Sequence, residues 1–267
     1  MLHQLVPTDK CFTPLRDAGL LASLPEKFTY PYKYKPHALS LQASAELQEY
    51  LQHQNEWEHN FGLKSGQEGK VIGKMFGVLV VQTTQGEIGY LAAFSGKLAG
   101  GYHHAKFVPP VYDALTEGSF LNNGMQELTR INEEISSLKE AHTAVNQHKI
   151  AELQQVRKEN SIALQAMLFN QYYFLNQAGE EKSLREIFRN NAGSNPPAGA
   201  GECAAPKLLH YAFKHHMKPL ALAEFWWGLS PKSAFWKHGA FYPACREKCA
   251  PILAHMLQDL VVDDMPS

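Results

Sequence analysis

The chain has 267 residues, of which 45% are hydrophobic and 19% charged, and its formal net charge is −1. A chain of this length can bury a substantial core, and a net charge this close to zero excludes a protein that coats nucleic acid by charge alone. Four cysteines, one of them the isolated Cys11, are too few for a secreted disulfide framework and favour a reducing compartment. The first residues lack the pattern of a signal peptide, and no window approaches 18 consecutive apolar residues. We therefore expect a cytoplasmic protein that does not span a membrane.

The first periodic segments are a helix and then a hairpin. In residues 36–63, Leu47 and Leu51 lie one helical turn apart, and Ser44 suits a helix start. In residues 71–95, two β-rich runs, VIGKMFGVLVV and EIGYLAAF, are separated by QTTQG, where Gly86 can adopt a left-handed turn conformation. The consecutive apolar residues VLVV predict a strand covered on both faces.

A long helical arm follows the hairpin, because no glycine or proline occurs between Gly124 and Gly179. Its apolar residues recur at steps of three and four, as in a coiled coil. One unbroken helix would be about 80 Å long, and a helical hairpin turning near residues 143–148 is the alternative. In either form the apolar seam needs a partner, which is the second half of the arm or another subunit. A coiled-coil oligomerisation module, forming a homodimer through the arm, is therefore one hypothesis for function. The seam residues are Leu128, Ile131, Ile135 and Leu138.

Together these patterns predict an α+β fold in which a small, mainly antiparallel sheet is packed by helices and a long coiled-coil-like arm is inserted. The expected strands are 76–81, 89–94 and 220–227, and the expected arm runs from about residue 125 to 173. Residues 1–123 form an N-terminal α+β part containing the hairpin 71–95, and residues 124–190 form the arm. Residues 191–267, rich in cysteine and tryptophan, are expected to pack with residues 1–123 as one body.

Three of the four cysteines fall in residues 201–249 and suggest a metal site. Cys203 precedes one predicted helix, and Cys245 and Cys249, four residues apart, open the next and share one of its faces. Thiolates are favoured at helix N-termini, and three of them can bind zinc with a water or one histidine as fourth ligand. The alternative is three small cysteines packed in a core. The candidate histidines are His210, His215 and His238.

The same stretch is locally basic, with seven Lys and Arg against three Glu in residues 201–250. Basic residues interleaved with tryptophans suit contact with RNA through phosphate pairing and base stacking. An apolar core with tryptophans and an ordinary basic rim would give the same composition. The candidate RNA-binding residues are Lys207, Lys214, Lys232, Trp236, Lys237, Arg246 and Lys248.

Several segments resemble the region that precedes the catalytic domain in bacterial RluA-type pseudouridine synthases. They are GKMFGVLVVQTTQGEIGYLAAFSGKL, FVPPVYD, LFNQYYFLNQAGEEKSLREIF, GECAAPKLLHYAF, PLALAEFWWGLSP and HGAFYPACREKCAPILAHML, spread over residues 11–260. The resemblance implies an RNA-associated accessory region whose partners are structured RNA (rRNA or tRNA) and a catalytic synthase domain in cis or in trans. The synthase domain carries its catalytic aspartate in a His-Arg-Leu-Asp type motif, which this chain lacks. We therefore expect no catalytic residue and no isomerisation of uridine by this chain, which ends before the place of that domain.

A second resemblance concerns the order of elements around the cysteines, which is similar to the cytidine-deaminase-like fold. In that fold a His or Cys opens one helix and a Pro-Cys-x-x-Cys opens the next, and all three residues bind zinc. Cys203, Cys245 and Cys249 fall in those places, but three residues separate the second pair, and the family's catalytic glutamate corresponds to Ala205. The resemblance thus implies a zinc-binding domain without deaminase activity, because no acid or base is present to move the proton.

Overall fold

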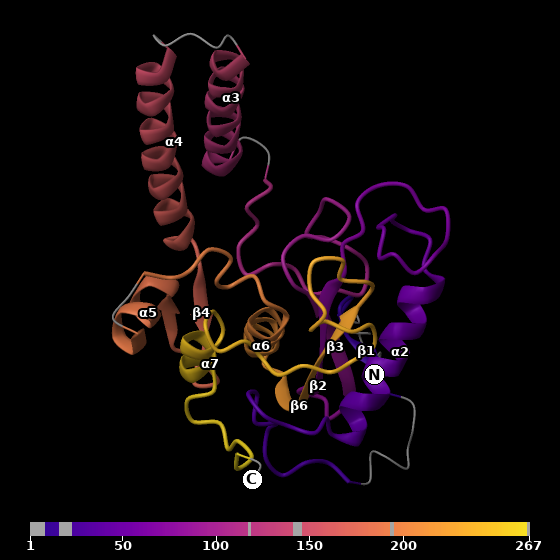
Figure 1. Cartoon of the computed structure of the whole chain (residues 1–267). Helices are drawn as coiled ribbons and strands as arrows, with labels where there is room; N and C mark the ends of the chain where they lie inside the picture. The colour runs from indigo at the N-terminus through magenta and orange to yellow at the C-terminus, as the bar shows by residue number, and fades with distance from the viewer. Residues whose placement is uncertain (1–8, 16–22, 117–118, 141–145, 193–194, 266–267) are drawn as a thin grey trace, which may run out of the picture. The chain divides into compact units, whose positions relative to one another are not determined.

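The computed structural model describes residues 9–15, 23–116, 119–140, 146–192 and 195–265. They form two compact units, a body made of the residues up to Val111 and from Tyr173 onward, and an arm from Tyr112 to Tyr172. The body is an antiparallel sheet packed by helices and the arm is a helical pair, so the predicted α+β class is confirmed (Figure 1).

The body is organised around a four-stranded sheet with the order β1-β3-β2-β6, in which every neighbouring pair is antiparallel. The three predicted strands are confirmed with slightly longer bounds, and the short β1 had not been predicted. Gly86, with a φ of 86°, turns the chain between β2 and β3 as expected. The strands are β1 (Thr13–Pro14), β2 (Lys74–Gln82), β3 (Ile88–Phe94) and β6 (Lys218–Trp227).

The two faces of this sheet are covered by different helices, α2 (Ala38–His53) and α6 (Ala204–Lys214), which Figure 1 shows on opposite sides. The face toward α2 is apolar, with Phe76 of β2 stacked on Phe225 of β6 at a centroid distance of 6.0 Å. The segment VLVV is fully buried, as predicted. Toward α6 the sheet presents Gly77, where an added Cβ would lie 3.0 Å from the Cβ of Ala204. This small pair lets the first turn of α6 approach the sheet closely.

Helix α2 begins earlier than the sequence suggested. His37 is its N-cap and accepts a hydrogen bond from the backbone N–H of Leu39, so the predicted start at Ser44 is wrong. Ser44 lies inside the helix, where its hydroxyl donates to the carbonyl of Ser40 at 2.7 Å. Because the hydroxyl donates to the carbonyl four residues earlier, its hydrogen-bonding capacity is used within the helix and the serine does not mark a helix start.

The remaining elements of the body follow the arm in sequence. A two-stranded ribbon pairs β4 with β5, and α7 contacts both α5 and α6. Tyr173, which had been predicted to end the arm, is instead the first residue of β4. The elements are β4 (Tyr173–Leu175), β5 (Glu181–Ser183), α5 (Leu184–Ala192) and α7 (Ala250–Met256).

The arm consists of two paired helices, α3 (Phe120–Glu140) and α4 (Asn146–Phe169), so the hairpin alternative is correct and the single long helix is wrong. Ile131, Ile135 and Leu153 form its small apolar cluster, with Leu138 and Ile150 packed against it. The apolar seam of α3 therefore packs against α4 of the same chain. Residues 143–145 of the predicted turn lie outside the described residues. Among the described helices, none is both long enough and apolar enough to cross a membrane.

Candidate metal centre

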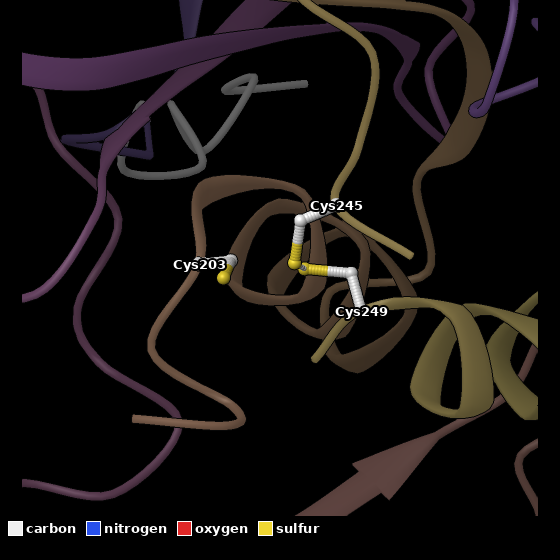
Figure 2. A group of neighbouring side chains, drawn as sticks. All are labelled: Cys203, Cys245 and Cys249. Atoms are coloured by element: carbon white, nitrogen blue, oxygen red, sulfur yellow. Dashed lines mark hydrogen bonds between the residues drawn. The ribbon is translucent and has the colours of Figure 1, made fainter. Parts of the chain in front are cut away.

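The sulfur atoms of Cys203, Cys245 and Cys249 converge in the body, all within 4.8 Å of one another. The Sγ atoms of Cys245 and Cys249 lie 3.4 Å apart. Figure 2 shows the Cys203 side chain approaching from one side and the other two side chains meeting opposite it. Tetrahedral zinc with bonds of about 2.3 Å requires sulfurs roughly 3.7 Å apart. The spacing in this chain is close to that value, so the cluster can hold a metal ion such as zinc.

Cys203 is positioned by the packing of α6 against the sheet. It is the N-cap residue of α6, with an extended backbone (φ −71°, ψ 160°), and no side-chain hydrogen bond caps the helix there. The preceding residue is anchored because the Glu202 carbonyl accepts a hydrogen bond from the backbone N–H of Gly96. Close contact between Ala204 and Gly77 then fixes the height of the helix above the sheet. The thiol is therefore held at the positive end of the α6 dipole, where the backbone N–H groups of the first turn point.

Cys245 and Cys249 are brought to the same place by a segment that runs along β6. The backbone N–H of Tyr242 donates to the Glu224 carbonyl, and Phe241 forms an isolated antiparallel bridge with Phe225. The expectation that both cysteines lie on one helix is wrong. Cys249 is the N-cap of α7, and Cys245 lies before it in a turn closed by the Cys249 N–H to Cys245 carbonyl bond.

The three thiols share protons when no metal is bound. Hydrogen bonds with Cys203 and Cys249 lower the pKa of Cys245, which is the exposed member of the cluster. The same contacts, reinforced by burial, raise the pKa of Cys249, and the hydrogen bond with Cys245 is the largest cause of the raised pKa of Cys203. The metal-free cluster therefore favours one thiolate, on Cys245. A divalent metal would displace the remaining protons, since only thiolates ligate metals strongly.

A buried carboxylic acid, which sequence analysis missed, lies beside the sulfurs. Glu224 projects from β6 toward α6, is 4% exposed, and accepts a hydrogen bond from the backbone N–H of Ala205 at 3.3 Å. The pKa of Glu224 is raised to about 8, chiefly by burial and to a lesser extent by the charge of Cys245, whereas the Ala205 N–H acts to lower it. The available signal was a single acidic residue in the apolar strand sequence LALAEFWW. Ala205 stands where the deaminase-like family has its catalytic glutamate. In this structure its backbone N–H instead bonds the carboxylate of Glu224, which comes from strand β6.

Lys207 has a different role from the one that the sequence suggested. It is only 4% exposed, and its ammonium group donates to the carbonyls of Phe94 at 2.9 Å and Gly96 at 3.2 Å. Burial lowers the pKa of Lys207 to about 8, while Glu202 and Cys203 act in the opposite direction. A lysine enclosed in this way is not available to bind RNA, so its assignment as an RNA contact is wrong. Its charge instead lies near the thiol cluster.

The three candidate histidines do not join the sulfur cluster. The Nδ1 atom of His210 accepts from the backbone N–H of Leu175, and that of His238 accepts from the N–H of Gly228. His215 stacks on Tyr211 and lies 3.6 Å from an Asp9 oxygen. Among the described residues, no histidine or carboxylate therefore supplies a fourth ligand atom within the cluster.

The other predicted RNA-binding residues are exposed or half-buried, and three of them belong to one loop, residues 229–242, called here the aromatic loop. Trp236 stacks on Trp226 at a centroid distance of 5.0 Å, and the neighbouring Phe235 is 65% exposed. The Tyr242 hydroxyl accepts from the Lys237 backbone N–H and donates to the Phe235 carbonyl, which holds the loop in shape. Lys232 is exposed on the same loop. Outside the loop, Lys214 lies at the end of α6, and Arg246 and Lys248 follow Cys245.

Searches of protein-family models, of curated proteins and of solved structures found no match to this chain. Its functional assignment therefore depends on the geometry described above and on the sequence resemblances.

Proposed function

We propose that the chain binds a zinc ion through Cys203, Cys245 and Cys249 and serves as an RNA-associated accessory region of an RluA-type pseudouridine synthase. In this role it contributes to binding or positioning RNA and does not isomerise uridine. The single observation that carries the zinc assignment is the convergence of Cys203 with two sulfurs more than forty positions away in the sequence. A single turn of the chain brings Cys245 and Cys249 together, but only the tertiary fold brings Cys203 to them.

The nature of the ligands favours zinc over the other common biological metals. Thiolates are soft ligands that select Zn²⁺, Cu⁺ and iron–sulfur clusters over Mg²⁺ and Ca²⁺, which prefer oxygen. A three-thiolate set with no described carboxylate among its ligand atoms fits a tetrahedral zinc ion.

Elemental analysis of protein purified without chelators tests the zinc assignment. We expect about one zinc per chain in the wild type and a large loss of zinc in Cys203→Ser, since a serine hydroxyl is a poor ligand for zinc. Cys11→Ser is the matched control, because Cys11 lies outside the cluster and its thiol contacts the Phe107 carbonyl. Equal zinc contents in Cys203→Ser and Cys11→Ser would contradict the assignment.

The aromatic loop supports the RNA part of the proposal. It presents Phe235 and Trp236 on a rigid turn, and Lys232 and Lys237 on the same loop can pair with phosphates. Aromatic side chains stack on unpaired bases with about 1–3 kcal/mol each, and nearby lysines supply the attraction to the RNA backbone. Stacking surfaces of this kind are typical of recognition of single-stranded loops in structured RNA.

Binding of the full chain to a structured rRNA or tRNA fragment over a range of salt concentrations tests this part. We expect the double variant Lys232→Gln/Lys237→Gln to weaken binding and to reduce the slope of log K against log salt by about 2, one unit for each lost phosphate contact. Lys139→Gln/Lys158→Gln, which removes the same charge from the exposed surface of the arm, is the control. Release of tritium from 5-tritiated uridine should stay at background. Equal effects of the two double variants would contradict the role of the aromatic loop.

The alternative of a coiled-coil oligomerisation module has less support. The seam that motivated it is buried between α3 and α4 of the same chain. The arm can therefore be stable without a second subunit.

A further inference from the structure

The sulfur cluster provides three ligand atoms, and zinc in proteins takes at least four. Within the described part of the chain, no histidine or carboxylate lies close enough to the three sulfurs to be the fourth ligand. Cys245 is exposed, so the cluster is accessible to small molecules from solvent. The coordination therefore has room for a ligand that the chain itself does not supply.

Glu224 lies next to this position without belonging to the cluster. Its carboxylate accepts a hydrogen bond from the backbone N–H of Ala205, two residues after Cys203, so it lies at the start of the helix that carries this thiol. At least one sulfur is nevertheless more than 4.8 Å away, since the carboxylate is not counted with the three ligand atoms. The carboxylate therefore lies beside the three ligand atoms and is not one of them.

The buried carboxylate of Glu224 has capacity for a further hydrogen bond. Glu224 forms no ion pair with any described lysine, arginine or histidine, and the Ala205 N–H is the one hydrogen bond its carboxylate accepts. A buried carboxylate that has few hydrogen-bond donors around it costs stability. A water held by a metal would donate a hydrogen bond to this carboxylate and offset that cost.

We infer that Glu224 accepts a hydrogen bond from a water molecule in the fourth coordination position of the metal, which makes the centre an open one. The inference rests on the proposed zinc site and extends it, because open sites bind water or substrate whereas closed sites only support the fold. Carboxylates that hydrogen-bond to metal ligands orient them and raise the affinity for the metal. The ligand class is water, or a small neutral molecule that donates through oxygen or nitrogen.

The surroundings can balance the charge of such a centre. Zinc with three thiolates carries a net charge of −1, and Glu224 adds another negative charge when ionised. Lys207 lies one helical turn after Cys203 on α6, and its buried ammonium group interacts electrostatically with Cys203. The N-terminus of α6 adds its positive dipole at the same end. Lys207 is therefore a buried positive charge on the same helix that can offset the negative charge of the centre.

X-ray absorption spectroscopy of the zinc-loaded full chain tests the open position. We expect three sulfur ligands and one oxygen or nitrogen ligand. In the cobalt-substituted protein, we expect added imidazole to change the visible spectrum as it displaces the water. Four sulfurs, or a cobalt spectrum that imidazole leaves unchanged, would overturn the inference.

The zinc affinity of Glu224 variants, measured by chelator competition, tests whether Glu224 is the hydrogen-bond acceptor of the water in the fourth position. We expect Glu224→Leu, which keeps the approximate shape but has no acceptor, to bind zinc about 10- to 100-fold more weakly. Glu224→Gln keeps an acceptor oxygen and should lie within about threefold of the wild type. Glu224→Asp, which draws the carboxylate back by one methylene, should show an intermediate loss and serves as a second variant if Glu224→Leu does not fold.

Unfolding of the metal-free variants separates this role from a purely structural one. If Glu224 only holds the Ala205 N–H, Glu224→Leu will destabilise the metal-free and zinc-bound proteins equally, and zinc affinity will not change. That result would overturn the inference while leaving the zinc site intact. A wild-type chain that binds no zinc would instead refute the proposed function itself, and the inference with it.

Discussion

The two faces of the central sheet differ in what they bury, although the same strands form both. Toward α2, β6 contributes Ala221, Ala223, Phe225 and Trp227 to one continuous apolar cluster. Toward α6, the same strand contributes the carboxylic acid of Glu224, which bonds to the first turn of that helix, and the helix itself contributes the buried Lys207. The hydrophobic effect alone accounts for burial of the apolar face toward α2. A face that buries ionisable groups costs stability, which is what we expect of a face that includes the proposed metal site.

The largest effect that distinguishes the faces is expected from Phe225→Ala on the α2 face. Phe225 is fully buried and contacts Phe76, Trp227 and Phe241. Its removal should lower the free energy of unfolding by about 3–5 kcal/mol, as measured by urea denaturation. Phe235→Ala, on the exposed aromatic loop, is the control and should change stability by no more than about 0.5 kcal/mol. Folded Phe225→Ala should still bind one zinc, and loss of the metal would show that the two faces are not independent.

A smaller effect, on the α6 side, is expected from pH. Burial is the largest cause that lowers the pKa of His210 to about 4, and the nearby Lys214 lowers it further. Between pH 6.5 and pH 4 the unfolded chain therefore binds a proton at this residue that the folded protein does not. Stability should fall as the pH drops through this window, by at most about 1.4 kcal/mol per pH unit from this residue.

Urea denaturation of the wild type and His210→Gln at pH 7, 6 and 5 measures this contribution. The variant should lose less stability than the wild type between pH 6.5 and pH 4, because glutamine does not take up a proton. Parallel pH profiles of the two proteins would contradict the assignment.

The smallest effect is expected from Ser44→Ala on the apolar side. Ser44 donates to a carbonyl within its own helix, and alanine is the better helix former. We expect a change within about 1 kcal/mol in the free energy of unfolding, with zinc content unaffected. A loss above 2 kcal/mol would show that polar groups on the α2 face also resist replacement, and the contrast between the faces would weaken.

Local sequence patterns predicted the elements of the fold well. The hairpin follows from two β-rich runs around Gly86, and the arm follows from a seam with no glycine or proline near it. These signals lie within a few residues, where backbone preferences and side-chain periodicity act directly. The start of α2 was misplaced because the sequence does not show whether a serine accepts from a backbone N–H at a helix start or donates to a carbonyl inside the helix. Ser44 donates to the Ser40 carbonyl inside α2.

The candidate site was predictable only in part. Two helix starts with cysteines indicated the convergence of Cys203 with Cys245 and Cys249, and the structure confirms it. Nothing local indicated that Glu224 would point at Ala205 rather than away, since that depends on the pleat of β6 and on the antiparallel pairing with β2. The burial of Lys207 was equally hidden, because the carbonyls that hold it come from residues more than a hundred positions earlier.

The close approach of α6 to β2 restricts the sequences that can keep this site. At Gly77 a methyl group would lie 3.0 Å from the Cβ of Ala204 and 3.2 Å from a Leu208 methyl, so neither position has spare volume. A larger residue at 77 would move the start of α6 outward by some tenths of an ångström, and Cys203 would move with it. The side-chain volumes at positions 77 and 204 are thus coupled, so the residues that one position can accept depend on the residue at the other. Related sequences that retain the three cysteines should therefore covary at this pair and conserve its combined volume.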